Sequence, residues 1–320
     1  MVENKKHTSG QWLVIVNPNA GSRKGEKDWH KISHMLKDAG IKFREVFTKH
    51  KEHATAIVSE TIKTGTRSFI VVGGDGTLNE VVNGIFNQHN VLTTQFLVAM
   101  IPVGTGNDWC RMFGIPFNYN EAVNIIKTHN TFLTDIGLVS YLSTNKNARR
   151  YFINVAGMGY DAVVAAKTNH DKEMGRGGVL IYLKNLFISL LFYKHTQINL
   201  QIDNAPALSH KTFSISIGIC KFNGGGMKQL PHAIPDDGIF NITLIKKLRK
   251  FTVLKQVKNL YDGSFINHPK VKTFTGSHIK ISSTPPIQLE ADGESLGHSP
   301  FEFSILPKSL YVVMGHNPSF

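Results

Sequence analysis

The chain has 320 residues, of which 41% are hydrophobic, a length and composition typical of a globular protein with room for two domains. Its two cysteines, Cys110 and Cys220, are too few for a disulfide framework, so we predict buried thiols in a reducing compartment. The net charge of +13 indicates an anionic partner: nucleic acid, lipid headgroups or a phosphorylated substrate.

Three broad classes are disfavoured by the sequence: nucleic-acid-binding, secreted and membrane-spanning proteins. No helix-turn-helix, zinc-finger or aromatic RNA-binding pattern is present, so we expect no nucleic-acid partner. The first ten residues have no apolar core, which argues against a secretory signal and predicts a frayed tail on a cytoplasmic protein. The most apolar stretch, Val179 to Tyr193, is shorter than the roughly 20 residues that span a bilayer.

Strands and helices are predicted to alternate along the first 137 residues. Continuous apolar runs predict buried strands, and apolar residues spaced three or four apart predict amphipathic helices. This alternation predicts an α/β domain with a mostly parallel sheet, which binds ligands at the carboxyl ends of its strands. The expected elements are strand 12–16, a helix through 29–36, strand 41–48, helix 54–64, strand 68–72, helix 78–87 and strand 96–101.

The pattern changes to short strands from Tyr151 onward. Only two long helical stretches are expected there, 171–193 and 250–262, so this half is predicted to be largely antiparallel β. We predict domains 1–137 and 138–320, and whether the last strands return to the first domain is left open. The expected strands are 151–155, 197–202, 213–220, 239–245, 278–282, 287–291 and 301–306.

Three of the predicted strands end in turns rich in glycine and small polar residues: Asn17–Ser22, Gly73–Thr77 and Gly104–Asp108. A glycine turn before a helix presents backbone N–H groups at the positive end of the helix dipole, which suits a phosphate. We therefore expect these three turns to lie at one edge of the sheet and to bind an anion. Helix capping by Thr105 or Asn107 is the alternative for the third turn.

Asp75 is the carboxylate inside the second glycine turn. Beside phosphate oxygens it can coordinate Mg²⁺ or orient an attacking hydroxyl, and the alternative is a helix cap. Thr77 offers a second cap, which would leave Asp75 for chemistry. Asn79 and Glu80, in isolation, are equally consistent with ordinary helix residues.

The second half of the chain carries two carboxylate loops. Asp236-Asp237-Gly238 fits either a site for a hard cation or an ordinary turn. Glu290, Asp292 and Glu294 lie within five residues, and one of them can act as a base toward a hydroxyl. The alternative is a polar hairpin around Asp-Gly.

The stretch 171–193 has an apolar middle between the basic residues Lys172, Arg176 and Lys194. This pattern is typical of a helix resting on a membrane surface, and equally of a helix packed on the β domain.

Taken in order, these motifs resemble those of the diacylglycerol kinase catalytic-domain family, closest to its soluble bacterial lipid kinases, which are related to the sphingosine and ceramide kinases. At Ser22-Arg23-Lys24 the chain departs from relatives that carry a lysine directly after the first glycine turn. The matching motifs are Asn17-Pro18-x-Ala20-Gly21, Gly73–Val81, Pro102–Asp108, Asp135–Gly137, Gly157–Asp161, Gly224–Gly226, Asp236–Gly238 and Asp292–Glu294.

The resemblance implies an enzyme that uses ATP and Mg²⁺ to phosphorylate a lipid hydroxyl in a cleft between an α/β domain and a β-sandwich. It implies Glu294 as proton acceptor, Asp75 as a catalytic assistant, and Mg²⁺ bound by Asp237 and the backbone oxygens of Ile234 and Ile239. The residues implied to bind nucleotide are Asn17, Pro18, Asn19, Ala20, Gly21, Thr48, Gly74, Asp75, Gly76, Thr77, Leu78, Asn79, Glu80 and Thr105.

The expected substrate is diacylglycerol or a related membrane lipid, and the expected location is cytoplasmic with peripheral attachment to an anionic membrane surface. Two alternatives are kept: a kinase of a dinucleotide or small molecule, like the NAD kinases that share the Gly-Gly-Asp-Gly-Thr turn, and a catalytically silent membrane-binding protein. Whether the protein is a homodimer stays open.

Overall fold

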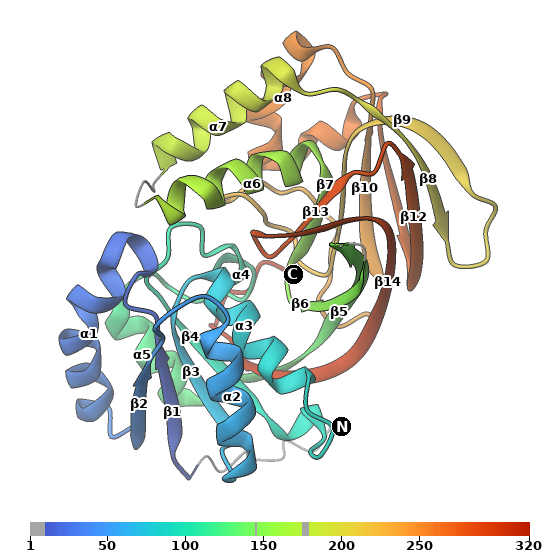
Figure 1. The fold of residues 1–320 in the computed structure, drawn as a ribbon. Coiled ribbons are helices and arrows are strands. Elements are labelled where there is room, and N and C mark those ends of the chain that lie inside the picture. The colour runs from blue at the N-terminus through green and yellow to red at the C-terminus, as the bar shows by residue number, and fades with distance from the viewer. Residues whose placement is uncertain (1–9, 145, 175–178) are drawn as a thin grey trace. The chain divides into compact units, whose positions relative to one another are not determined.

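The computed structural model describes residues 10–144, 146–174 and 179–320, so the predicted N-terminal tail and Arg176 lie outside the described residues (Figure 1). The chain divides into two compact units. Unit 1 comprises the chain up to Gly104, with Phe113–Thr134 and Ser309–Ser319, and unit 2 comprises Thr105–Met112, Asp135–Lys308 and Phe320.

Unit 1 is the predicted α/β domain, and its sheet is parallel. The strand order is β4-β3-β1-β2, and Tyr311 and Val312 near the end of the chain pair in parallel with β4. Every residue of β1, β3 and β4 is buried, which is typical of a sheet covered on both faces. Its elements are β1 (Trp12–Val16), α1 (Ala20–Asp38), β2 (Phe43–Phe47), α2 (His53–Lys63), β3 (Ser68–Gly73), α3 (Asp75–Phe86), η1 (Thr93–Gln95), β4 (Leu97–Pro102) and α5 (Tyr119–Thr128).

Unit 2 is built on antiparallel strands, as predicted. The pairing runs β9-β7-β13-β14-β12-β8 and returns to β9, so these strands form a closed ring, while β10 and β11 extend the sheet beyond β9. Its strands are β5 (Thr131–Ser143, which begins in unit 1), β6 (Lys146–Phe152), β7 (Val155–Gly159), β8 (Thr196–Ile202), β9 (Leu208–Gly218), β10 (Phe240–Lys246), β11 (Val271–Gly276), β12 (His278–Thr284), β13 (Gln288–Ala291) and β14 (Glu294–Val313, which ends in unit 1).

Three helices of unit 2 contribute side chains to one apolar cluster that also includes Phe213 of β9. The prediction of a single helix over 171–193 is wrong, because the structure has two helices there. Strand β6 was predicted only in part, and strands β5 and β11 were not predicted. The cluster comprises Tyr160, Val164, Leu186, Leu190, Phe213 and Val253. The helices are α4 (Asp108–Met112), α6 (Tyr160–Glu173), α7 (Val179–Phe192), α8 (Lys250–Asp262) and the short η2 (Ser264–Asn267). No helix within the described residues is long and apolar enough to cross a membrane.

The strand predicted over 151–155 is also divided, into the end of β6 and the start of β7. The backbone N–H groups of Ile153, Asn154 and Val155 donate to the carboxylate of Asp292, which lies far away in the sequence. These N–H groups bind a side chain instead of a neighbouring strand. The strand is therefore interrupted between β6 and β7. Cys110 and Cys220 are buried free thiols, as predicted.

Candidate active site

In unit 1 the first two strand-end turns are joined by direct contacts at the carboxyl edge of the sheet. The backbone N–H of Asn17 donates to the oxygen of Val72 over 2.9 Å, and its side-chain Nδ2 donates to Oγ1 of Thr77 over 2.9 Å. The start of the third turn is attached as well, because the N–H groups of Val103 and Gly104 donate to the oxygen of Gly73 over 2.9 and 3.0 Å. The first turn, the second turn and Gly104 at the start of the third turn therefore lie at one edge of the sheet, as predicted.

Close backbone approach explains two of the glycines. A Cβ on Gly21 would lie 1.8 Å from the oxygen of Val103, and a Cβ on Gly73 would lie 2.7 Å from Cβ of Thr77. Contacts below 3.0 Å are not tolerated without a shift of the backbone or of the neighbour. Glycine at position 21 lets the first turn approach the backbone of Val103, and glycine at position 73 keeps the second turn compact.

The first turn carries a run of left-handed backbone. Gly21, Ser22 and Arg23 have φ values of 60°, 59° and 68°, although only glycine adopts this region without strain. Strained backbone of this kind is concentrated at binding and catalytic sites. The side chain of Arg23 is exposed and pairs with Glu26 through its Nε at 2.8 Å.

Asp75 lies half-buried in the first turn of α3. The N-cap of this helix is Gly74, which has no side chain with which to cap it, and the N–H of Leu78 donates to the oxygen of Gly74 over 3.1 Å. Thr77 does not serve as the alternative cap, because its hydroxyl accepts from Asn17. The start of α3 therefore has the backbone geometry that suits an anion.

Three of the residues implied to bind nucleotide use their side chains inside unit 1. Leu78 and Asn79 are fully buried, and Asn79 Oδ1 accepts from Asn83 over 3.1 Å. The carboxylate of Glu80 accepts from the N–H groups of Glu52 and Ala54 at 2.9 and 3.0 Å, so it caps the start of α2. These side-chain contacts of Asn79 and Glu80 all lie within unit 1.

Thr48 follows β2 and is also buried, with its N–H donating to the oxygen of Val16 over 2.9 Å. Unit 1 thus holds all the nucleotide residues implied by the resemblance except Thr105, which belongs to unit 2. Unit 2 also holds Glu294 and the implied metal loop at 234–239.

In unit 2, Asp292 and Gly293 form the predicted two-residue hairpin between β13 and β14. Both residues have positive φ, 51° and 81°, which is the conformation that Asp-Gly favours in such turns. The side chain of Asp292 is buried and accepts three backbone N–H groups, at 2.9, 3.0 and 3.2 Å, from residues 153–155. Asp292 is thus an anchor that fixes the hairpin to the β6–β7 junction.

The structure separates the three carboxylates that the sequence left equivalent. Glu290 is 2% exposed, with Oε1 accepting from Asn223 Nδ2 at 3.0 Å and Oε2 accepting from Gly293 N–H at 2.9 Å. Burial raises the pKa of Glu290 to about 8 despite these hydrogen bonds. Glu294 is the one of the three that is not buried, at the first residue of β14 after the anchored turn.

A second buried acid accompanies Glu290. Asp161 accepts from the hydroxyls of Ser214 and Ser216 at 2.6 and 3.3 Å, and burial raises its pKa to about 6. Asp161 belongs to the Gly157–Asp161 motif, but no role was predicted for it there. The signal in the sequence was Gly157 of the same motif. A Cβ at this position would lie 2.5 Å from Oε1 of Glu290 and 3.0 Å from Cβ of Asp161, so the glycine leaves room for both acids.

Asp108 anchors the glycine-rich loop at Gly224–Gly226. Its carboxylate is buried and accepts from the N–H groups of Gly225 and Gly226 at 2.7 and 2.6 Å, with Arg111 Nε 3.4 Å away. Burial raises its pKa, while these hydrogen bonds oppose the rise. Asp108 therefore has a clear structural role in unit 2.

The predicted metal loop is held by Asp135, which is fully buried. Its two oxygens accept from the N–H groups of Gly238 and Lys308 at 2.8 and 2.7 Å. Asp237 is exposed as a residue, but partial desolvation of its carboxyl group and the neighbouring Asp236 raise its pKa. A cation would relieve this repulsion, so the donor chemistry fits Mg²⁺, although no group of three His, Cys, Asp or Glu side chains in the described part of the chain can hold a metal.

Comparison with known proteins gives matches over nearly the whole chain. Residues 11–139 match the diacylglycerol kinase catalytic domain, and residues 154–314 match the YegS C-terminal NAD kinase beta sandwich-like domain. A diacylglycerol kinase of Staphylococcus haemolyticus is 31% identical over 300 residues, covering 93% of this chain and 86% of its own. A diacylglycerol kinase of Bacillus subtilis is 27% identical, covering 94% and 95%.

Solved structures show the same fold. A diacylglycerol kinase from Bacillus anthracis superposes with a TM-score of 0.70 at 21% identity, covering 96% of this chain and 97% of its own. A yeast NADH kinase shares the fold more distantly, with a TM-score of 0.55 at 11% identity and coverage of 97% and 85%. From the two matching domains and the 31% identity to the staphylococcal kinase, we conclude that the chain belongs to the diacylglycerol kinase catalytic-domain family and is a kinase.

Proposed function

We propose that the protein transfers the γ-phosphoryl group of ATP to the hydroxyl of diacylglycerol and so makes phosphatidic acid. The observation that carries this proposal is the Asp292-anchored hairpin, which leaves Glu294 as the carboxylate of its loop that is not buried. A rigid loop that presents one carboxylate suits a base, because a base must be held within hydrogen-bond reach of the proton it removes. The relatives named diacylglycerol kinase support this choice of substrate.

The turns of unit 1 would bind the phosphates of ATP. Support comes from the start of α3 at Asp75, from the left-handed run at Gly21–Arg23, and from the contact that joins them through Asn17 and Thr77. Backbone N–H groups at such positions bind phosphate oxygens without a specific side chain. Asp75, half-buried beside these groups, would assist at the phosphates.

In the proposed reaction the lipid hydroxyl oxygen attacks the γ-phosphorus of ATP. A new P–O bond forms to the lipid, the bond between the γ-phosphorus and the β–γ bridging oxygen breaks, and ADP leaves with that bond's electron pair. Glu294 takes the proton that the hydroxyl loses. Catalysis of this kind depends on positioning and on charge stabilisation.

Mg²⁺ would be held by Asp237 with the backbone oxygens of Ile234 and Ile239, in a loop whose position Asp135 fixes. When bound, the ion would supply positive charge, which stabilises the negative charge of phosphate oxygens. Because diacylglycerol resides in bilayers, we also propose that the protein works attached peripherally to the membrane, at its cytoplasmic face.

The test is incubation of the whole protein with γ-labelled ATP and Mg²⁺ on a mixed lipid extract, on pure diacylglycerol in detergent micelles, and on NAD. Labelled phosphatidic acid as the main product is the expected result. Glu294→Gln should lower kcat on diacylglycerol at least about 100-fold with little change in the KM for ATP, because general-base catalysis contributes about that factor.

The matched control is Glu302→Gln, an exposed glutamate on the same strand, which should leave kcat unchanged. Label found on NAD alone would support the dinucleotide kinase alternative. No transfer to any of the three acceptors would support the catalytically silent alternative, and full activity of Glu294→Gln would exclude Glu294 as the base.

A further inference from the structure

Helix α7 has apolar residues on both of its sides, including the side that faces solvent. Leu186 and Leu190 point into the apolar cluster of unit 2. The helix repeats this spacing on its outer side, where a surface helix of a globular protein ordinarily carries polar residues. The outer residues are Phe187, Ile188, Leu191 and Phe192, exposed by 47%, 36%, 61% and 75%.

Helix α8 continues this apolar face. Phe251 is 68% exposed and Leu254 is 41% exposed, three residues apart on one side of the helix. Val253, between them, packs in the same cluster as Leu186 and Leu190, and Nζ of Lys250 donates to the backbone oxygen of Leu191. The two helices lie beside each other at the top of the view in Figure 1.

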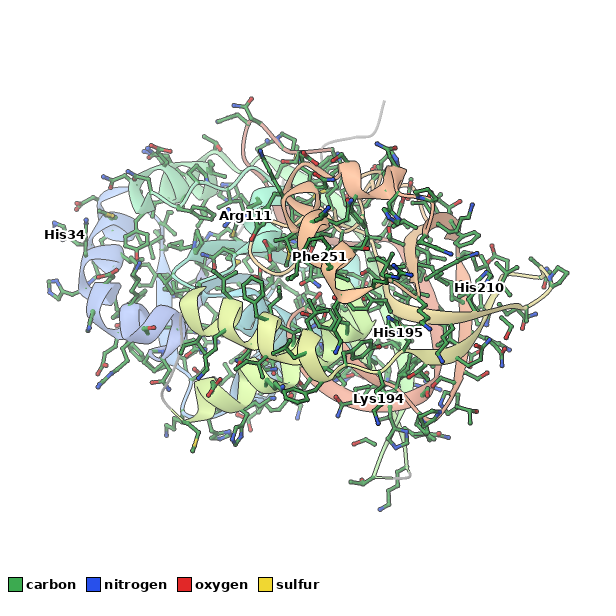
Figure 2. The ribbon with its side chains drawn as sticks, turned by 90° about the horizontal axis from the view of Figure 1, so that it is seen from above. His34, Arg111, Lys194, His195, His210 and Phe251 are labelled. Atoms are coloured by element: carbon green, nitrogen blue, oxygen red, sulfur yellow. The ribbon has the colours of Figure 1, made fainter. Side chains whose placement is uncertain are left out.

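We define the α7–α8 surface as these outer residues: Phe187, Ile188, Leu191, Phe192, Phe251 and Leu254. Figure 2 looks down on this side of unit 2, with Phe251 on α8 and Lys194 just after α7. An apolar patch composed of several large side chains on adjacent elements indicates a binding surface.

The charges around the α7–α8 surface are predominantly positive. The sequence of α7 has one charged residue, Lys184, and the sequence 246–262 has six basic residues against the single acid Asp262. Lys255 Nζ lies 4.8 Å from the centre of the Phe251 ring, so cation and apolar group are interleaved. The exposed basic residues are Lys184, Lys194, Lys247, Arg249, Lys250, Lys255 and Lys258.

These charges decide between the possible occupants of the surface. A second copy of the chain would bring the same lysines together, and their repulsion would oppose association. A neutral apolar protein surface would leave the cations without partners. An anionic lipid bilayer suits both the apolar and the basic residues of the surface. The apolar side chains would contact the acyl chains, and the lysines would contact the headgroup phosphates.

We propose that the α7–α8 surface docks the protein on an anionic lipid bilayer, with Leu191, Phe192 and Phe251 entering the acyl region and the surrounding lysines binding headgroup phosphates. This deepens the proposed function, on which it rests, by naming the surface through which the enzyme reaches a lipid substrate. The surface lies within unit 2, on helices whose packing against the sheet is described above.

The test is co-sedimentation of the whole protein with vesicles of phosphatidylcholine alone or with 30% phosphatidylglycerol, in the absence of ATP. The double variant Phe192→Ser/Phe251→Ser should bind the anionic vesicles more than about tenfold more weakly. Lys255→Gln/Lys258→Gln should weaken that binding about 25-fold at low salt, since each basic residue contributes about a fivefold factor. High salt should remove most of the lysine effect.

The matched apolar control is Leu92→Ser/Phe117→Ser, two exposed side chains of unit 1. The matched charge control is Lys63→Gln/Lys272→Gln, two exposed lysines on other elements, α2 and β11. Both controls should bind vesicles as the wild type does. Far-ultraviolet circular dichroism confirms that each variant is folded.

Equal vesicle binding by the wild type and both surface variants would overturn the proposal. It would also be overturned if sedimentation equilibrium showed a dimer that these variants dissociate while vesicle binding stays unchanged. Activity on diacylglycerol in detergent micelles separates the two hypotheses: a failure of the proposed function abolishes transfer there without altering vesicle binding, and a failure of the docking proposal does the reverse.

Discussion

The buried carboxyl of Glu290 makes the stability of the protein depend on pH in a direction that can be worked out. Burial raises its pKa from 4.5 to about 8, with the hydrogen bonds from Asn223 and Gly293 opposing the rise and Asp161 adding to it. The folded protein therefore holds a proton between about pH 4.5 and 8 that the unfolded chain releases. Since the folded state binds more protons in this window, the free energy of unfolding falls as the pH rises through it.

The size of this effect follows from the same interval. Each unit of pKa difference is worth about 1.36 kcal/mol, so the rise in the pKa of Glu290 from 4.5 to about 8 lowers the free energy of unfolding by at most about 5 kcal/mol as the pH increases. Glu290→Gln keeps the shape of the neutral acid and cannot ionise. Its amide nitrogen would face either Asn223 Nδ2 or Gly293 N–H, both of which are donors, so we expect a loss of about 1 to 3 kcal/mol at pH 5.

The assay is urea denaturation of the wild type and Glu290→Gln from pH 5 to pH 9. The wild type should be the more stable protein at pH 5, and its advantage should shrink steadily and reverse by about pH 8.5. The exposed Glu45→Gln on β2 serves as the control and should give a curve parallel to that of the wild type. If the difference between Glu290→Gln and the wild type were the same at every pH, Glu290 would not be neutral in the folded protein.

Three further variants test the loops. Gly73→Ala should lower the free energy of unfolding by about 1 to 3 kcal/mol and raise the KM for ATP, because its Cβ would lie 2.7 Å from Cβ of Thr77. Gly10→Ala is the control, since a Cβ there has no atom within 4 Å. If Gly73→Ala were as stable as the wild type, the packing argument would be contradicted. Asp292→Asn should lower the free energy of unfolding by about 2 kcal/mol and lower kcat, because an amide NH2 group replaces one carboxylate oxygen and would face a backbone N–H. Urea titration measures the stability and steady-state kinetics measure kcat. An unchanged urea midpoint would show that Asp292 does not anchor the hairpin. Glu80→Gln should cost about 1 kcal/mol with the KM for ATP unchanged, and a raised KM would show that Glu80 contacts nucleotide instead of only capping α2.

Much of unit 1 was predictable because its signals are local. Trp12–Val16 is a strand at its predicted bounds, and the glycine turns follow β1, β3 and β4 where they were expected. In a parallel sheet covered on both faces, continuous apolar runs and turn residues specify the elements without reference to distant contacts. Helix α8 was foreseen in unit 2 for the same reason, since its bounds at Lys250 and Asp262 match the predicted 250–262.

Unit 2 was harder to predict because distant residues decide where its elements begin and end. The carboxylate of Asp292 takes the backbone donors of residues 153–155 and divides one predicted strand into β6 and β7. Helix α6 has apolar residues without a clear helical period, and it forms because its side chains Tyr160 and Val164 pack in the apolar cluster. Such contacts leave no local pattern in the sequence.

The sequence by itself determined the order of the motifs, the alternation of strand and helix in the first half, and the candidates Asp75 and Glu294. Only the tertiary structure decided the roles of the acidic residues: Glu290 is buried and its pKa is raised, Asp292 anchors a turn, and Glu294 is the one of the three that is not buried. It likewise showed that both sides of α7 are apolar and that one of them faces solvent. Burial and hydrogen bonding set the protonation and exposure of a side chain, and both depend on residues that meet only when the chain is folded.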